Sequence, residues 1–388
     1  MKICSIVAEY NPFHNGHLSQ IKYIKTKLKP DLIAVFLSGN FTQRGEPACI
    51  DKYTRARHAI LAGADVVFEL PTVFATQTAE IFASGAVKLI NSLPFENFIC
   101  FGAECGDKDA IIKTASAMLN ESTEYKSLIK TELKKGTSLL KAREIALKNT
   151  YQDFNEEILS SPNNVLGIEY VKAIIKNDYK MGVEVLKRDG LGYNSVKIDD
   201  VNPSALSLRE AIINGKKSKI KNAVPKFVYG DLISIPNIEK ELLFSILSAD
   251  KKDIQSVIDC AEGLENRIKA LIKNNFSLDE LLEKLTSKRY TTARIKRIFL
   301  STMLKIDKKL VSSALKKDLY LKVLAISKDK TDILSKLSTS KYPLITRKSD
   351  ITKLSSVAKS VFEKDVFAND IYSLITKTPL NEFNMQIL

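Results

Sequence analysis

Short apolar runs alternate with stretches of helical spacing through the first half of the chain. Apolar side chains occupy successive positions at 2–8 (KICSIVA), 32–37 (LIAVFL), 65–70, 97–101 and 182–187. Such runs are typical of parallel strands that are buried on both faces. The segments between them place apolar residues three and four apart, notably at 15–28, 51–62, 75–91, 107–150, 165–176 and 205–213. The alternation predicts an α/β fold with a Rossmann-like parallel sheet and right-handed crossovers.

The pattern changes after about residue 215. Residues 215–225 (GKKSKIKNAVP) indicate a basic linker, and 238–316 and 353–375 have the spacing of amphipathic helices. Only 318–326 and 342–346 could be further strands. The sequence therefore predicts two domains, an α/β domain over 1–215 and a mostly helical domain over 216–388.

The charge follows the same division. The net charge is +14, yet residues 1–200 hold 25 basic and 24 acidic side chains, against 34 and 21 in residues 201–388. Within 281–330 the count is 14 against 4. A neutral first half and a basic second half suggest a small-molecule site joined to a module that binds a polyanion. A generally Lys-rich composition with solvated faces is the alternative.

Other features of the composition exclude several classes of protein. The chain contains no run of 18 apolar residues, so we expect no transmembrane helix and no membrane partner. The first apolar run breaks at Glu9, which favours a buried strand rather than a signal peptide. We therefore expect a cytoplasmic location. The five cysteines are scattered, and we expect reduced thiols without a zinc site.

Two of the three histidines lie in one tetrapeptide, His14-Asn15-Gly16-His17, directly after the first predicted strand. In a doubly wound sheet this point, between a strand and the next helix, binds phosphate. Gly16 has no Cβ, so its backbone can approach a phosphate closely. His14 and His17 fall on one helical face, where both can donate to one phosphoryl group and stabilise its charge in a transition state. The tetrapeptide resembles the HxGH signature of the adenylyl-transferring α/β superfamily.

That superfamily has a second element, a turn of the type S-S-T-x-x-R after the last strand. Residues 204–209 read Ser-Ala-Leu-Ser-Leu-Arg. Ser204 can cap a helix and donate to phosphate, and Arg209 can neutralise the leaving phosphates. Ala205 and Leu206 replace the two hydroxyl residues expected there, and Ser207 could substitute for them.

Longer strings make the resemblance more specific. They are VAEYNPFHNGH (7–17), SGNFTQRGEPA (38–48), DKYTRARHAILAGADVVFELP (51–71), CFGAECGD (100–107), SPNNVLGIEYVKA (161–173), KRDG (187–190) and KRYTTARIKR (288–297). Together they are similar to the tRNA-Met cytidine acetate ligase family over most of the chain. The resemblance implies that ATP activates acetate as acetyl-adenylate, and that the acetyl group passes to N4 of the wobble cytidine of elongator tRNA-Met.

The resemblance also implies an ATP site. This site would contain Gly102, Asn164 and Arg188. It would also contain the loop after the first strand, whose residues are Val7, Ala8, Glu9, Tyr10, Asn11, Pro12, Phe13, His14, Asn15, Gly16, His17, Leu18, Ser19 and Gln20. For three of these residues, the position relative to the predicted strands and helices is consistent with such a site. Gly102 follows the fourth strand, Arg188 follows the fifth, and we expect Asn164 at a helix N-cap.

The loop after the second strand faces the same crevice. We predict that its Asn40, Gln43 and Arg44, with Glu46 nearby, form part of an acetate or cytidine pocket. Asp51, Arg55 and Arg57 are expected to form a structural salt network at a helix start, and His58 is expected to be packed.

The string 288–297 is the candidate tRNA surface. Lys288, Arg289, Arg294, Lys296 and Arg297 can follow a phosphate backbone, and Tyr290 offers a ring for stacking on a base. The alternative is a solvated amphipathic helix whose core stripe is Ile295, Ile298, Phe299 and Met303.

For the predicted reaction, the main task of the protein is to align acetate with the α-phosphate of ATP. Mg²⁺ is expected on the phosphates, but the sequence contains no Asp-rich motif for it. Two other functions stay open at this point. One is an adenylyltransferase of cofactor synthesis, of the nicotinamide or pantetheine mononucleotide type, which would not need the basic second half. The other is a non-catalytic RNA-binding protein, which would not need His14, Gly16 and His17.

Overall fold

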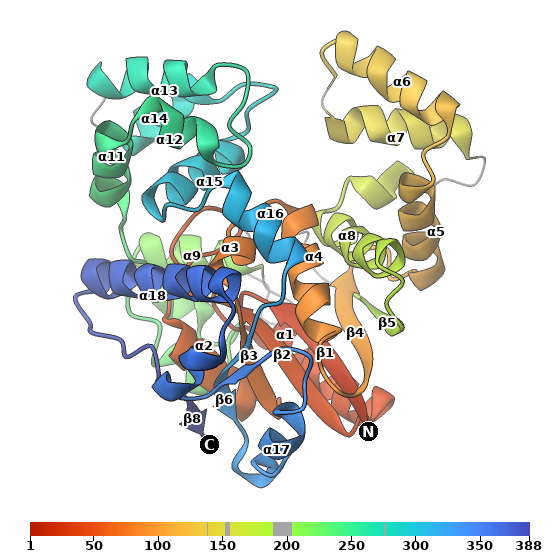
Figure 1. Cartoon of the computed structure of the whole chain (residues 1–388), viewed down its shortest axis with the longest axis vertical. Helices are drawn as coiled ribbons and strands as arrows, with labels where there is room; N and C mark the ends of the chain where they lie inside the picture. The colour runs from red at the N-terminus through yellow and green to blue at the C-terminus, as the bar shows by residue number, and fades with distance from the viewer. Residues whose placement is uncertain (138, 152–155, 189–203, 275–276) are drawn as a thin grey trace.

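A mostly parallel sheet forms the centre of the computed structural model, which describes residues 1–137, 139–151, 156–188, 204–274 and 277–388 (Figure 1). The strand order is β5-β4-β1-β2-β3-β6-β7, and β8 pairs with β6. The strands are β1 (Lys2–Ala8), β2 (Leu32–Ser38), β3 (Val66–Leu70), β4 (Glu96–Ala103), β5 (Met181–Lys187), β6 (Leu321–Ile326), β7 (Leu344–Ile345) and β8 (Gln386–Ile387). The predicted α/β class is confirmed.

The first five strands are parallel, and their apolar runs are buried by helices on both faces. Every residue of β2 is buried. One face packs on α1 (Asn15–Tyr23), α2 (Lys52–Leu61) and α9 (Ala205–Ile213). The other packs on α4 (Ala79–Ile90), α5 (Lys108–Leu119) and α8 (Pro162–Lys176). Because parallel strands end at the same edge of the sheet, their carboxyl ends meet in one place.

The remaining helices lie mostly above and beside the sheet in Figure 1. A pair, α6 (Thr123–Lys134) and α7 (Leu139–Thr150), stands apart from a second group that contains α11 to α15. The bounds of the others are α3 (Thr72–Ala75), α10 (Lys226–Tyr229), α11 (Glu239–Ser248), α12 (Lys251–Ser256), α13 (Leu264–Leu271), α14 (Leu278–Leu285), α15 (Thr292–Met303), α16 (Lys308–Lys316), α17 (Ile333–Leu337) and α18 (Ser356–Thr376).

The late strands belong to the same sheet as the early ones. β6 runs antiparallel to β3, with Val66 opposite Ile326, and β8 adds to β6 near the chain end. Four buried charges reinforce this seam: Lys52 and Lys322 each contact both Glu69 and Glu382. The sheet therefore draws strands from both sides of residue 215, and the division into two domains stays a prediction.

Several element boundaries differ from the prediction. The helix expected over 15–28 is α-helical to Tyr23 and continues as a π-turn, Ile24–Leu28. The segment 107–150, expected to be helical, contains the three helices α5, α6 and α7, and the helix expected over 165–176 already starts at Pro162. The two possible late strands are present as β6 and β7, while β8 was not predicted. In the described part of the chain the five cysteines are free thiols, and no helix is long and apolar enough to cross a bilayer.

Candidate active site

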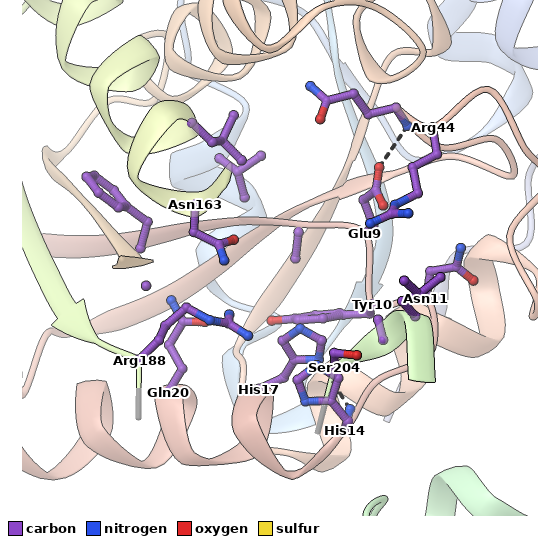
Figure 2. Close-up of a pocket in the computed structure, with 18 of the residues that line it drawn as sticks. Glu9, Tyr10, Asn11, His14, His17, Gln20, Arg44, Asn163, Arg188 and Ser204 are labelled. Atoms are coloured by element: carbon purple, nitrogen blue, oxygen red, sulfur yellow. Dashed lines mark hydrogen bonds between the residues drawn. The ribbon is translucent and has the colours of Figure 1, made fainter. Parts of the chain in front are cut away.

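A pocket opens at the carboxyl ends of the parallel strands, where the sequence analysis expected the nucleotide (Figure 2). It is lined by the ends of β1 and β4, by the loops after β1, β2 and β5, and by the helices α1, α4, α8 and α9. Its lining includes Val7, Ala8, Glu9, Tyr10, Asn11, His14, His17, Gln20, Gln43, Arg44, Gly102, Arg188, Ser204 and Arg209. Most of the predicted site residues are thus brought together. Of the predicted β1-loop residues, Pro12, Phe13, Asn15, Gly16, Leu18 and Ser19 belong to the same loop and helix but are not part of this lining.

The two histidines sit at the start of α1, with His14 at the N-cap and His17 three positions later. Their rings stack with centroids 3.6 Å apart. The backbone N–H of His14 donates to Nδ1 of His17 at 3.2 Å. Since Nδ1 then accepts, the neutral His17 ring carries its proton on Nε2 and can donate from there.

Both rings are neutral at physiological pH. Burial, followed by the Arg188 charge, lowers the pKa of His14 to about 3. Burial also lowers the pKa of His17 well below its usual value, and the charges of His14 and Arg188 act in the same direction. Nδ1 of His14 is buried and has no hydrogen-bond partner. The pair therefore offers neutral N–H donors and an unsatisfied polar atom beside a helix N-terminus, which suits a phosphoryl group.

The first turn of α9 contributes to the pocket next to the β1 loop. Ser204 caps this helix, its Oγ accepting from the Ser207 N–H at 3.0 Å. Arg209 is buried, donates to the carbonyl of Asn11 at 2.7 Å and lines the pocket. Ala205 and Leu206 line the pocket too. Ser207 does not replace the hydroxyl groups that Ala205 and Leu206 lack, because its Oγ donates back to the Ser204 carbonyl.

Glu9 is the carboxylate of the pocket, and arginines surround it. Burial raises its pKa, while a hydrogen bond from the Gln43 N–H at 2.8 Å and the charges of Arg209, Arg44 and Arg55 oppose that shift. Figure 2 shows the Arg44 side chain beside Glu9. Asn40, predicted in the same pocket, instead lies buried and bonds to Asn369 and to the N–H of Lys52.

The expected salt network at the start of α2 is not formed. Arg55 is fully buried and donates to four carbonyls, those of Glu9, Ser38, Gly39 and Ile50. Asp51 instead caps α2, and Arg57 pairs with Asp231. The packed position predicted for His58 is confirmed, with its Nε2 2.8 Å from Asp231. Arg55 thus fixes the ends of β1 and β2 relative to each other.

Gly102 and Arg188 are in contact across the ends of β4 and β5. A Cβ on Gly102 would lie 2.9 Å from Cγ of Arg188, so a larger residue would require the Arg188 side chain to shift. Asn164 is not an N-cap: Ser161 holds that position because α8 starts at Pro162, and Asn164 Oδ1 accepts from the Cys105 N–H at 3.1 Å. Its neighbour Asn163 lines the pocket instead.

Four apolar and aromatic residues of the lining were not predicted. They are Phe82 from α4, Phe101 from β4, and Leu166 and Tyr170 from α8. The hydroxyls of Tyr170 and of Tyr10 are buried and have no hydrogen-bond partner, and burial raises both pKa values. The sequence showed these residues only as apolar positions of core helices and a strand.

The predicted tRNA string begins just before α15 and is largely paired within the protein. Tyr290 is buried, donates to the Ala261 carbonyl at 2.8 Å and is covered by Arg294, so the predicted base stacking is wrong. Arg294 and Arg297 both contact Asp259. Lys296 pairs with Glu46 at 2.6 Å, and Arg289 pairs with Glu262. Lys288 and Arg289 are exposed.

The pocket offers little to hold a metal ion. Across the residues with described positions, no group of three or more His, Cys, Asp or Glu side chains could ligate one. Glu9 is the carboxylate of the lining, and it already accepts a hydrogen bond from the Gln43 N–H. This donor set does not fit a protein-held Mg²⁺, which prefers several oxygen ligands.

Known proteins with this architecture identify the family. The model of the HIGH Nucleotidyl Transferase family matches residues 1–386. A tRNA(Met) cytidine acetate ligase of Caldanaerobacter subterraneus subsp. tengcongensis is 38% identical, covering 97% of this chain and 96% of that protein. The one of Thermosipho melanesiensis is 36% identical, covering 96% and 94%. Two crystal structures of Thermotoga maritima TmcAL, 29% identical and covered fully, superpose with TM-scores of 0.92 for the apo form and 0.89 for the form bound with alpha-thio ATP. This chain belongs to the HIGH nucleotidyl transferase family and, within it, to the tRNA(Met) cytidine acetate ligases.

Proposed function

We propose that this protein uses ATP and acetate to acetylate N4 of the wobble cytidine of elongator tRNA-Met. The observation that carries the proposal is the stacked His14–His17 pair in a pocket that Arg209 also lines, in a chain that aligns over nearly its full length with named ligases. The ATP-analogue complex of the Thermotoga protein supports ATP as the nucleotide.

In the first step an acetate oxygen attacks the α-phosphorus of ATP, and pyrophosphate leaves. Acetate is already ionised at neutral pH, so this step needs alignment and charge stabilisation rather than a base. His17 Nε2–H and His14 donate to the α-phosphate, and Arg209 with Arg188 attracts the departing pyrophosphate. If Mg²⁺ takes part, the ATP phosphates would have to hold it, since the described residues offer no cluster of ligands, and it would supply charge neutralisation there.

In the second step the N4 amine of cytidine attacks the acetyl carbon of acetyl-adenylate. AMP leaves, and the amine loses a proton. The target base lies in an anticodon loop, where it is single-stranded and requires little unpairing energy. Gln43 and Arg44, which line the pocket beside Glu9, belong to the acetate or cytidine subsite of this proposal.

The tRNA partner fits the excess of positive charge in the second half of the chain. Lys288 and Arg289 are the exposed cations of the string and act as phosphate contacts. Arg294, Lys296 and Arg297 support the surface through their internal pairs. A cytoplasmic location, where tRNA is found, completes the proposal.

The test is ATP–pyrophosphate exchange with and without acetate, followed by transfer of labelled acetate to purified tRNA. We expect exchange that requires acetate, and label in tRNA-Met. His17→Ala should abolish the exchange because it removes the Nε2 donor at the phosphate. It should leave tRNA binding unchanged.

Exchange that ignores acetate but responds to a mononucleotide or to phosphopantetheine would instead indicate a cofactor adenylyltransferase. ATP binding without any exchange would contradict an enzymatic role. Full exchange in His17→Ala would contradict the assignment of that residue.

A further inference from the structure

A tight turn after β2 carries two pocket residues at its tip. The Gly45 N–H donates to the Thr42 carbonyl at 3.0 Å, which makes Gln43 and Arg44 the central residues of a β-turn. The Thr42 N–H donates to the Glu46 carbonyl at 2.9 Å, and Phe41 bridges to Pro47 just outside. The turn thus projects Gln43 and Arg44 into the pocket as one rigid unit.

On its pocket side the turn is attached to Glu9. The Gln43 N–H donates to Glu9 Oε1 at 2.8 Å, and the Arg44 charge acts on the same carboxylate. Figure 2 shows this bond and the Arg44 side chain lying alongside.

On its outer side the turn rests on helix α15 of the second half. A Cβ on Gly45 would lie 2.7 Å from the backbone N of Arg297 and 2.7 Å from the backbone C of Lys296, and Gly45 has a φ of +78°. Backbone cannot yield as a flexible side chain can, so only glycine fits this contact. Next to it, Lys296 Nζ lies 2.6 Å from Glu46 Oε1, and both side chains are partly buried.

The base of the same loop is held by α18. Asn40 donates to Asn369 Oδ1 at 3.0 Å, and the Tyr372 hydroxyl donates to the Ala48 carbonyl at 2.9 Å. Both contacts are buried. Two helices from beyond residue 215 therefore hold the loop on the side away from the pocket.

We propose that Gly45, Glu46 and Lys296 are positioning residues that set Gln43 and Arg44 against the carboxylate substrate, so that the helical half completes the acid-binding side of the pocket. This inference rests on the proposed function. The guanidinium of Arg44 is the group suited to a small carboxylate, and its reach depends on where the turn sits. Misplacing an aligned reactant by about 1 Å is enough to cost about a hundredfold in rate, so a shift of the turn should register in the acetate-dependent step.

The first test compares two glycines of matched conformation. Gly45→Ala meets the backbone of α15, whereas Gly136→Ala has a φ of +83° and nothing within 4 Å. Both carry the same left-handed strain, so their difference isolates the contact with α15. We expect Gly45→Ala to raise the KM for acetate in ATP–pyrophosphate exchange about tenfold or more, with the KM for ATP changed less than about twofold. Gly136→Ala should behave as wild type.

The second test reverses the ion pair. Lys296→Glu and Glu46→Lys should each raise the KM for acetate, and the double variant should recover it because the pair re-forms with opposite polarity. Lys180→Glu, in a pair with Asp178 that is almost fully exposed, is the control and should change nothing. Hydrogen–deuterium exchange of residues 39–48 should be faster in the single variants and restored in the double variant.

These readouts separate the inference from the proposed function. The acetate dependence of wild-type exchange tests the function alone, and the protection of residues 39–48 tests the positioning without any activity. An unchanged KM for acetate in Gly45→Ala would overturn the inference. So would single charge variants that weaken tRNA binding while leaving KM and protection unchanged, since Lys296 would then act only as a phosphate contact.

Discussion

At the scale of single residues, the site depends on where a neutral histidine holds its proton. The His14 N–H occupies Nδ1 of His17, which leaves Nε2–H as the donor. Burial keeps both rings uncharged, so they donate to a phosphoryl oxygen without adding a cation to the crowded charges of Arg188 and Arg209. The spacing of the two histidines indicated the phosphate site, but the stacking of their rings and their neutrality follow from packing and could not be read from the tetrapeptide.

The lowered pKa of His14 makes the stability of the fold depend on pH. Its pKa is about 3 in the folded protein, against about 6.5 in an unfolded chain. Between these values the unfolded chain binds a proton that the folded protein does not, so stability is lost as the pH falls from 6.5 toward 3. We expect the free energy of unfolding of the wild type to fall by about 1.4 kcal/mol per pH unit more than that of His14→Asn over this window.

Urea unfolding at pH 7, 6, 5 and 4 measures the two slopes. His14→Asn keeps a residue suited to the N-cap, and both proteins retain His17, so the difference reports His14 alone. Parallel slopes would mean that the His14 ring is not held neutral by burial.

At the scale of elements, the local sequence pattern predicted the strands and helices better than it predicted which side chains pair with one another. The apolar runs predicted five strands, and the stripe Ile295, Ile298, Phe299 and Met303 of α15, which the alternative of an amphipathic helix contained, is buried. The N-cap position of Asn164 was wrong although the signal was present, because Pro162 favours the first helical position and moves the start of α8. The internal pairs of Arg294 and Arg297 could not be predicted, since Asp259 lies in the turn between α12 and α13 and helical periodicity does not reveal such a partner.

These pairs leave the segment before α15 as the place to test RNA contact. Lys288→Ala with Arg289→Ala should weaken tRNA binding and reduce the slope of log affinity against log salt by about 2, because two phosphate contacts are lost. Acetate-dependent pyrophosphate exchange should persist. Filter binding at several salt concentrations measures the slope.

Lys176→Ala with Lys180→Ala is the matched control, since it removes two exposed charges at the far end of α8 and the start of β5. It should leave the slope unchanged. A collapse of exchange in the Lys288/Arg289 variant would instead connect this segment to the chemistry.

At the scale of the whole molecule, the two halves share one sheet, although the pocket is lined by residues of the first half. β6 covers the edge of β3, and the buried charges Lys52, Lys322, Glu69 and Glu382 neutralise one another across that seam. Charges of opposite sign paired in this way are tolerated in a core, whereas removing one partner costs about 3–5 kcal/mol. The sequence pattern and the composition both change near residue 215. The sheet has no edge at this division, because β6 from the second half pairs with β3 from the first.

A fragment of residues 1–215 should therefore fail to fold as a stable unit. The edge of β3 would be exposed in this fragment. Lys52 would lose its contact with Glu382, and Glu69 would lose its contact with Lys322. The helices that hold the loop of Gln43 and Arg44 would also be missing. We expect a broad, weakly cooperative urea transition and poor amide protection in β3, because that strand loses its hydrogen-bonded neighbour β6 and the remaining Lys52–Glu69 pair loses half of its partners, while a typical stability is only about 5–15 kcal/mol. A cooperative transition with native near-UV circular dichroism and ATP binding would show that the first half is an independent domain, and the seam would then be an interface between two domains that fold separately.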